Sequence, residues 1–272
     1  MVTTTTTNNT SSSSSSPLYP HYLPVRPEGF APALDVPAFA APEPGLRADP
    51  AKPALLAAKG AAVAAVTPRV GTEIRGVQLS ALDAAGLDQV ALLAAERGVL
   101  VGNLRTLLGS RTSYDLWHID QTFTPNTPST TFFWALETPG SGGGDTAFTS
   151  LTAAYAALSP AYRATLHSLR LRHTSASAGE VARVGHERAL REAVAAEHPL
   201  IVRHPVTGAP ALFVNPAMAR DVVGAKPQES AAVLGFLHDH IRSLDFGCRV
   251  RWEKGTVVVW DQAYAPEAGA KE

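Results

Sequence analysis

The chain has 272 residues, and its 23 lysines and arginines against 24 aspartates and glutamates give a formal net charge of −1. This balance leaves no electrostatic footprint for nucleic acid or an anionic membrane surface, and no apolar run is long enough to predict a transmembrane helix. Cys248 is the only cysteine, which excludes an internal disulfide framework and a cysteine-based zinc finger. Metal binding is therefore left to the nine histidines and the carboxylates.

Residues 1–53 predict a disordered arm. Residues 1–16 are a run of Thr, Asn and Ser that cannot bury apolar surface, and residues 17–53 are rich in proline, which favours extended chain. The arm has no basic segment followed by an apolar one, so it is not a secretory signal and we expect a cytoplasmic protein. Residues 54–272 are expected to form one domain.

The first elements of this domain follow from its turn and cap residues. Residues 66–79 alternate roughly between polar and apolar around two glycines, which predicts short strands with a turn or bulge. Residues 80–83 resemble a capping box before a helix that ends at Gly98, and residues 99–101 predict a buried strand.

Short strands and grouped helices follow. We expect strands around Trp117–Phe123 and Thr130–Leu136, a glycine-rich turn at residues 138–145, a helix capped by Thr149 or Ser150, and a second helix opened by Ser159 and Pro160. The later pattern predicts a strand at residues 169–173, a hairpin of residues 201–204 and 211–214, a helix over 228–242, and strands at 248–252 and 257–260. This order is not a repeated βαβ pattern. It favours a mostly β, α+β fold, an antiparallel sandwich or barrel decorated with helices.

The sharpest local motif is Trp117-His118-Ile119-Asp120. On a strand, residues i and i+2 point to the same face, so His118 and Asp120 are expected to converge. One imidazole and one carboxylate supply two ligands of the 2-His-1-carboxylate facial triad that holds Fe(II). A hydrogen-bonded His beside an Asp remains the simpler interpretation of an isolated H-x-D.

Longer stretches extend the motif. The segments WHIDQTF, PSTTFFWALETP, GGDTAFTS and AYAALSP follow one another, and TPRVGTEIRGVQLS, HPVTGAPALFVNP and RWEKGTVVVWDQ lie on either side of them. Together, over roughly residues 66–262, they resemble the taurine dioxygenase (TauD/TfdA-like) family, in particular its eukaryotic sulfonate dioxygenase branch. The resemblance implies a double-stranded β-helix (jelly roll) core, which we expect to be incomplete here.

The resemblance also implies a site. His118 and Asp120 would be the first two ligands of Fe(II), and Thr146 would contact the carboxylate of the co-substrate 2-oxoglutarate. Phe123 matches an aromatic position of the substrate pocket, with core packing as an equal contender. The binding partners of such an enzyme would be a small-molecule substrate and O2. The charge balance and the lack of a long apolar run predict no nucleic-acid and no membrane partner, and homo-oligomer formation stays open.

The chain departs from the family in two places. Glu267 occupies the position of the family's distal histidine ligand, and the arginines of the family pattern would fall beyond Glu272. Near residues 101–103 the chain also omits several tens of residues that precede H-x-D in the family. We therefore expect an internal gap and a truncation after about residue 262, from a mis-predicted gene or a splice variant.

Two functions of different class follow. The first is an Fe(II)- and 2-oxoglutarate-dependent dioxygenase that hydroxylates a small organic substrate, for example a sulfonate such as taurine, and releases succinate and CO2. The alternative is an inactive jelly-roll remnant that binds a partner or ligand without turnover. A zinc hydrolase has no support beyond the two ligands. His173 and His204 are expected to be satisfied or exposed, and Arg249 and Arg251 to be solvated charges.

Overall fold

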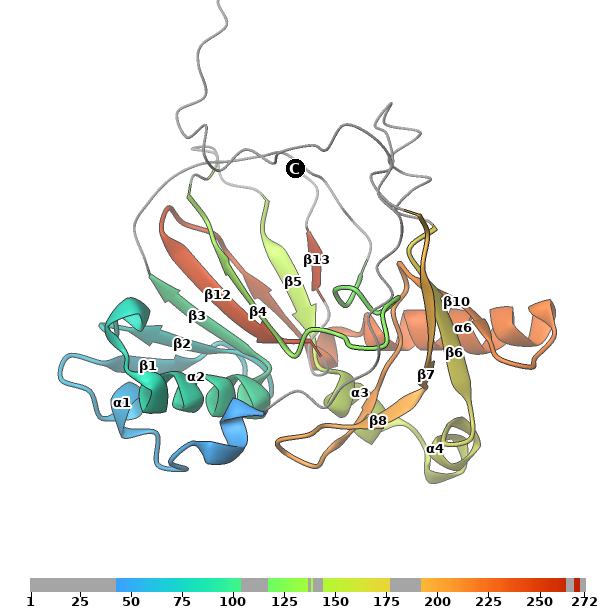
Figure 1. Cartoon of the computed structure of the whole chain (residues 1–272), viewed down its shortest axis with the longest axis horizontal. Coiled ribbons are helices and arrows are strands. Elements are labelled where there is room, and N and C mark those ends of the chain that lie inside the picture. Colours follow the sequence, from blue (N-terminus) through green and yellow to red (C-terminus); the bar gives the residue numbers. More distant parts are fainter. Residues whose placement is uncertain are drawn as a thin grey trace, which may run out of the picture.

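The protein is described by a computed structural model over residues 43–103, 117–136, 138, 144–176 and 192–262, together with the backbone of 267–269 (Figure 1). Its largest sheet has five strands in the order β1-β2-β3-β12-β4. These strands are β1 (Ala62–Ala65), β2 (Thr72–Arg75), β3 (Val99–Asn103), β12 (Thr256–Asp261) and β4 (Thr130–Trp134). β2 and β3 are parallel, and the other neighbours are antiparallel.

Helix α2 (Ala84–Arg97) connects the two parallel strands and lies beside the sheet (Figure 1). Gly98 ends the helix at φ 75°, as expected, because glycine adopts this conformation without a steric penalty. The cap at its start differs from the expected box: the Asp83 side chain accepts from the Gly86 N–H, whereas Ser80 lies in the preceding 3-10 helix η3 (Leu79–Ala81). Asp83 directly precedes the helix, so its side chain reaches the unpaired N–H groups of the first helical turn. Ser80 lies too far from them in the chain.

Part of the expected arm is folded. Residues 43–53 include the 3-10 helix η2 (Pro44–Arg47) and the start of helix α1 (Pro53–Leu56), and η2 packs against α2. Arg47 forms an ion pair with Asp88 at 2.7 Å, and Lys52 forms one with Glu96 at 3.0 Å. The rest of the arm, residues 1–42, lies outside the described residues, so the division into arm and domain stays a prediction.

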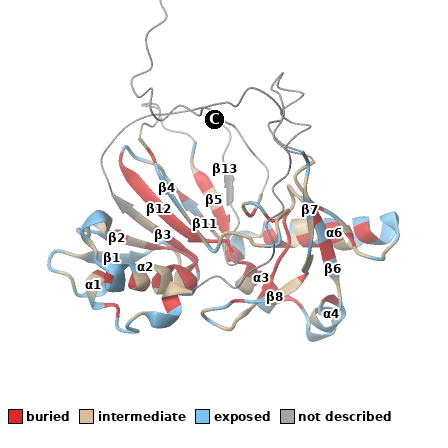
Figure 2. Ribbon diagram, in the orientation of Figure 1, coloured by how far each residue is buried: buried red, intermediate tan, exposed pale blue. Residues whose placement is uncertain are grey.

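A second sheet, in the order β11-β5-β13, faces the first. Its strands are β5 (Thr146–Thr149), β11 (Gly247–Val250) and β13 (Glu267–Gly269). Phe148 of this sheet packs against Trp260 of β12 with ring centroids 5.4 Å apart, and β12 is buried along its whole length (Figure 2). The core between the two sheets also holds Cys248, and burial raises the pKa of its thiol to about 11, so it is an inert core residue.

The third part of the molecule joins strands and helices around the largest hydrophobic cluster. It contains the sheet β10-β6-β7 and the hairpin β8-β9, with strands β6 (Arg170–Thr174), β7 (Ala195–Pro199), β8 (Ile201–Arg203), β9 (Pro210–Leu212) and β10 (Ala219–Val222). Its helical segments are α3 (Leu151–Ala157), α4 (Pro160–Leu166), α6 (Pro227–Ile241) and η4 (Leu244–Phe246). Leu234, Leu237 and Ile241 are the buried apolar face of α6, as its periodicity predicts.

These elements confirm the mixed fold with a jelly-roll core and helices. The helix caps Ser150 and Ser159, the strand at residues 170–174 and the hairpin lie where the sequence predicts them. None of the helices in the described part of the chain has the length and apolarity needed to cross a membrane.

Candidate metal centre

The H-x-D motif does not lie on a regular strand, contrary to the expectation for Trp117–Phe123. His118 is an isolated bridge residue, and residues 120–123 form a turn. Gln121 has φ 51°, a left-handed conformation that turns the chain directly after Asp120. The i, i+2 rule for strands therefore does not explain the convergence of His118 and Asp120. Hydrogen bonds from distant elements hold this segment in place.

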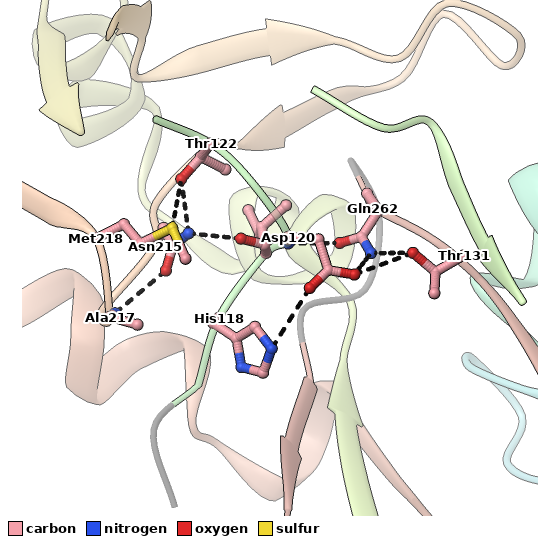
Figure 3. Close-up of polar contacts among 9 residues, drawn as sticks. His118, Asp120, Thr122, Thr131, Asn215, Ala217, Met218 and Gln262 are labelled. Atoms are coloured by element: carbon pink, nitrogen blue, oxygen red, sulfur yellow. Dashed lines mark hydrogen bonds and ion pairs between the residues drawn. The ribbon is translucent and has the colours of Figure 1, made fainter. Parts of the chain in front are cut away.

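His118 and Asp120 nevertheless converge (Figure 3). Nε2 of His118 lies 3.6 Å from Oδ1 of Asp120, and both side chains are partly exposed, at 21% and 33%. Two ligand atoms at 2.0–2.2 Å from one ion and at right angles to it are about 3 Å apart. A small rotation of the imidazole would bring the pair to that separation, so these two side chains fit adjacent positions on a metal ion.

The second oxygen of Asp120 is occupied by the protein. Oδ2 accepts hydrogen bonds from Nε2 of Gln262 and from Oγ1 of Thr131, the latter at 3.0 Å, and the Gln262 amide also donates to Thr131 (Figure 3). Oε1 of Gln262 accepts from the Asp120 backbone N–H at 3.0 Å. Thr131 belongs to β4 and Gln262 directly follows β12, so the edge of the main sheet holds the carboxylate.

A second network holds the same segment from the other side. The buried Asn215 donates to the Ile119 carbonyl at 2.8 Å and to Oγ1 of Thr122 at 2.7 Å. Nδ1 of the buried His173 lies 2.8 Å from the same Thr122 oxygen. Burial, and then the charge of His198, lower the pKa of His173 to about 3, so its imidazole is neutral. His173 therefore supports the segment through Nδ1 and Thr122. Its buried Nε2 has no hydrogen-bond partner among the described residues, so the expectation of a satisfied or exposed histidine is wrong for this nitrogen.

His204 is also buried and lies beside the last residue of β12. Its Nε2 is 3.1 Å from Oδ2 of Asp261, while its Nδ1 accepts from the N–H groups of Val206 and Thr207. Glu43 lies within reach of this pair: burial and the charge of Asp261 raise the pKa of Glu43, and His204 opposes the shift. The pair joins the hairpin region to β12 directly next to Gln262.

Thr146 and Phe123, the residues expected at the 2-oxoglutarate and substrate positions, have different surroundings. Thr146 begins β5 and is buried, and its Oγ1 accepts from Nε1 of Trp252 at 2.9 Å. Because this bond uses the oxygen as acceptor, the hydroxyl proton is directed elsewhere. Phe123 is half-buried in the turn that follows Asp120. Neither role is tested by these positions, and both stay predictions.

The third ligand position is not filled from the described residues. Among them, no group of three or more His, Cys, Asp or Glu side chains gathers in metal-binding geometry. The backbone of β13 pairs Glu267 with Phe148, but the Glu267 side chain lies outside the described residues. The donor set thus fits two of the three positions of a facial triad. The gap expected near residues 101–103 lies at the end of β3, directly before residues 104–116, which are outside the described part.

Two arginines that the sequence left as solvated charges line a separate hollow of about 290 Å³. Arg249 is mostly exposed and pairs with Asp145 at 2.9 Å, and Arg251 is exposed. Arg75, Glu73 and Glu253 line the same hollow, and Arg75 pairs with Glu73 at 2.8 Å, so its charges are of both signs. This balance favours solvated surface charges over an anion-binding pocket.

Sequence reasoning alone missed Gln262, Thr131, Thr122 and Asn215. Gln262 carried the one available signal, since it ends the segment RWEKGTVVVWDQ that resembles the family. The other three are common polar residues in unremarkable contexts. Their role depends on contacts between residues up to 142 positions apart, which no local pattern encodes.

The chain is similar in sequence to two dioxygenases from fungi. The chain is 38% identical to the alpha-ketoglutarate-dependent dioxygenase cnsP of Penicillium expansum, covering 91% of the chain and 80% of the relative. It is 31% identical to the alpha-ketoglutarate-dependent sulfonate dioxygenase of Saccharomyces cerevisiae, over 80% of the chain and 66% of the relative. The first alignment runs over 298 residues, more than the chain has, so that relative contains residues without a counterpart here.

The fold comparison agrees. A crystal structure of a taurine dioxygenase from Burkholderia xenovorans superposes with a TM-score of 0.64 and 25% identity, covering 78% of the chain and 84% of that structure. The family model described as taurine catabolism dioxygenase TauD, TfdA family matches residues 104–264, more than half of the chain. The chain therefore belongs to the TauD/TfdA family of dioxygenases, enzymes that use 2-oxoglutarate and Fe(II).

Proposed function

We propose that the chain is an Fe(II)- and 2-oxoglutarate-dependent dioxygenase that hydroxylates a small organic substrate and releases succinate and CO2. The observation that carries the proposal is the partly exposed pair of His118 Nε2 and Asp120 Oδ1, 3.6 Å apart, with the second carboxylate oxygen held by the protein. This arrangement places one imidazole nitrogen and one carboxylate oxygen beside each other, as two ligands of a facial triad would be. In the relatives, dependence on alpha-ketoglutarate is part of the name.

His118 and Asp120 would hold the metal, which when bound supplies the activation of O2 that amino-acid side chains cannot provide. The chain's own task is to fix the two ligands and to present polar groups to the co-substrate. Thr146 suits the second task, because its Oγ1 accepts from Trp252 and its hydroxyl proton can be donated to a carboxylate of 2-oxoglutarate. Phe123 would border the substrate from the turn after Asp120.

A sulfonate is the substrate class that we favour. The support is the similarity to the yeast protein, whose name specifies sulfonate substrates, and to the taurine dioxygenase structure. The chain covers 66% of the yeast protein, so that relative also contains residues that have no counterpart in this chain. A direct comparison of taurine with substrates that lack a sulfonate, under identical conditions, tests the preference.

One observation favours a second candidate, a jelly-roll protein that binds ligand without turnover. The described residues supply two ligands and not the three of a facial triad. The 298-residue alignment with the Penicillium protein also fits the expected internal gap. A protein of this kind would retain the His118 and Asp120 pair and bind a divalent metal weakly, but release no succinate.

Anaerobic titration of the full chain with Fe(II) and 2-oxoglutarate, followed by succinate release in air, separates the two. Metal binding with the charge-transfer band of the 2-oxoglutarate complex and succinate release support the enzyme. Binding without succinate supports the second candidate. His118→Ala should abolish binding, whereas His167→Ala, which alters an exposed histidine bonded to Tyr155 at 2.9 Å, should leave it unchanged. Equal affinity in both variants would remove the site.

A further inference from the structure

We propose that Gln262 is a positioning residue that fixes the Asp120 carboxylate so that Oδ1 alone is presented beside His118. The inference rests on the proposed function in one respect, since it takes Oδ1 to be the metal-binding oxygen. It concerns a residue for which neither the H-x-D motif nor the distal ligand position makes any demand.

The Gln262 side chain is almost fully buried, at 1% exposure, and its amide is satisfied at both ends. Its Oε1 accepts from the backbone N–H of Asp120, and its Nε2 donates both to Oδ2 of Asp120 and to Oγ1 of Thr131. The Gln262 amide therefore forms hydrogen bonds with both the backbone and the side chain of Asp120. The opposite amide orientation would set Oε1 against two oxygens and Nε2 against an N–H, so these contacts determine the orientation.

The two carboxylate oxygens of Asp120 have different neighbours. Oδ2 receives two donors, Gln262 Nε2 and Thr131 Oγ1, and both lie on the side away from His118 (Figure 3). Oδ1 faces His118 Nε2 at 3.6 Å. An ionised carboxylate held in this way offers a metal one oxygen in one direction, which is monodentate ligation by Oδ1.

The amide itself has a rigid base. The Gln262 backbone N–H donates to the Ser129 carbonyl at 2.9 Å, and the preceding Asp261 N–H donates to Gly98 at 3.0 Å. β12 lies between β3 and the edge strand β4 in the five-stranded sheet, and β4 carries Thr131. The sheet thus places both donors for Oδ2, while the turn that bears Asp120 has no strand ladder of its own.

The test compares three variants of the full chain, with Mn(II) as the probe and the loss of the free-ion resonance as the readout. Gln262→Met keeps the size of the side chain and removes its hydrogen bonds, and it should weaken Mn(II) binding 10–100-fold. Thr131→Val removes one of the two donors and should weaken binding less. Gln89→Met is the matched control, because Gln89 is also a buried glutamine that accepts a backbone N–H, from Ala54 at 2.8 Å. It should lower the Tm and leave Mn(II) affinity within twofold.

A cycle in the metal-free protein separates this inference from the proposed function. If Gln262 holds Asp120, the Tm loss caused by Gln262→Met should shrink by at least half in an Asp120→Ala background. Additive Tm losses, or Mn(II) affinity in Gln262→Met within twofold of the wild-type value, would overturn the inference. If the wild-type chain binds no Mn(II), the proposed function fails, and the metal-free cycle alone decides whether Gln262 positions Asp120.

Discussion

Replacing Asn215 by alanine should loosen the candidate site from a position that does not contact the metal. Asn215 is fully buried, and its side chain makes three hydrogen bonds: to the Ile119 carbonyl, to Thr122 Oγ1, and from the Ala217 N–H at 3.1 Å. Ile119 and Thr122 lie on either side of Asp120. The side chain therefore fastens the turn that carries the ligand to the loop between β9 and β10.

The size of the effect follows from these three bonds. Each buried hydrogen bond contributes about 1 kcal/mol net, so Asn215→Ala should lower the free energy of unfolding by about 3 kcal/mol. For a domain of this size that corresponds to a fall in Tm of about 6–12 °C. Asn215→Asp should cost at least as much, because it keeps the acceptor for Ala217 but turns an oxygen toward two other oxygens.

Urea denaturation followed by circular dichroism measures the loss, and Mn(II) titration of the same samples measures its effect on the site. Gln89→Ala provides the scale for one lost hydrogen bond, about 1 kcal/mol, at a distant position. Mn(II) affinity should fall in Asn215→Ala and not in Gln89→Ala. If the two variants lose equal stability, or if Asn215→Ala binds Mn(II) as the wild type does, then the network around Asn215 does not order the turn.

Three further results are expected. Because burial lowers the pKa of His173 from 6.5 to about 3, the unfolded state binds the proton more readily, so stability should fall as the pH drops below 6.5, by about 2 kcal/mol at pH 5; urea midpoints should show this slope, and a His173→Gln variant that kept it would contradict the assignment. Since Gln121 has φ 51°, Gln121→Gly should have a higher Tm than Gln121→Val, and the reverse order in thermal melts would exclude the left-handed turn. Trp252→Phe removes the donor to Thr146 and should raise the KM for 2-oxoglutarate with a smaller change in kcat; an unchanged KM would separate Thr146 from the co-substrate.

The elements that could be predicted from sequence are those with local causes. The helix over Ala84–Arg97 ends at a glycine with positive φ, and the strand Arg170–Thr174 alternates between exposed and buried residues, so caps and periodicity were sufficient. The strand expected at Trp117–Phe123 was wrong because the local sequence carries no signal for the turn that replaces it. Its alternating residues suggested a ladder, but the left-handed Gln121 breaks the extended chain, and that conformation has no signal in a glutamine.

The candidate site shows the same division. His118 and Asp120 were identified from a four-residue motif and from the resemblance around it, and the structure places their ligand atoms 3.6 Å apart. The reason for that proximity could not be predicted. It lies in Gln262 and Asn215, which reach the motif from residues 142 and 96 positions later in the chain. Packing of this range is decided by the fold as a whole and not by local sequence.

The hydrogen bonds that hold Asp120 and its turn therefore do not depend on a bound metal. The hydrogen bonds from Gln262, Thr131 and Asn215 that hold the turn end on atoms other than Oδ1 of Asp120: Gln262 and Thr131 use Oδ2, and Asn215 uses Ile119 and Thr122. A metal that binds here meets an Asp120 carboxylate that is already ordered, so little conformational entropy of this side chain is lost on binding. A missing third ligand would consequently weaken the affinity without disordering the other two, and the wild-type chain should retain this geometry whether or not it turns over.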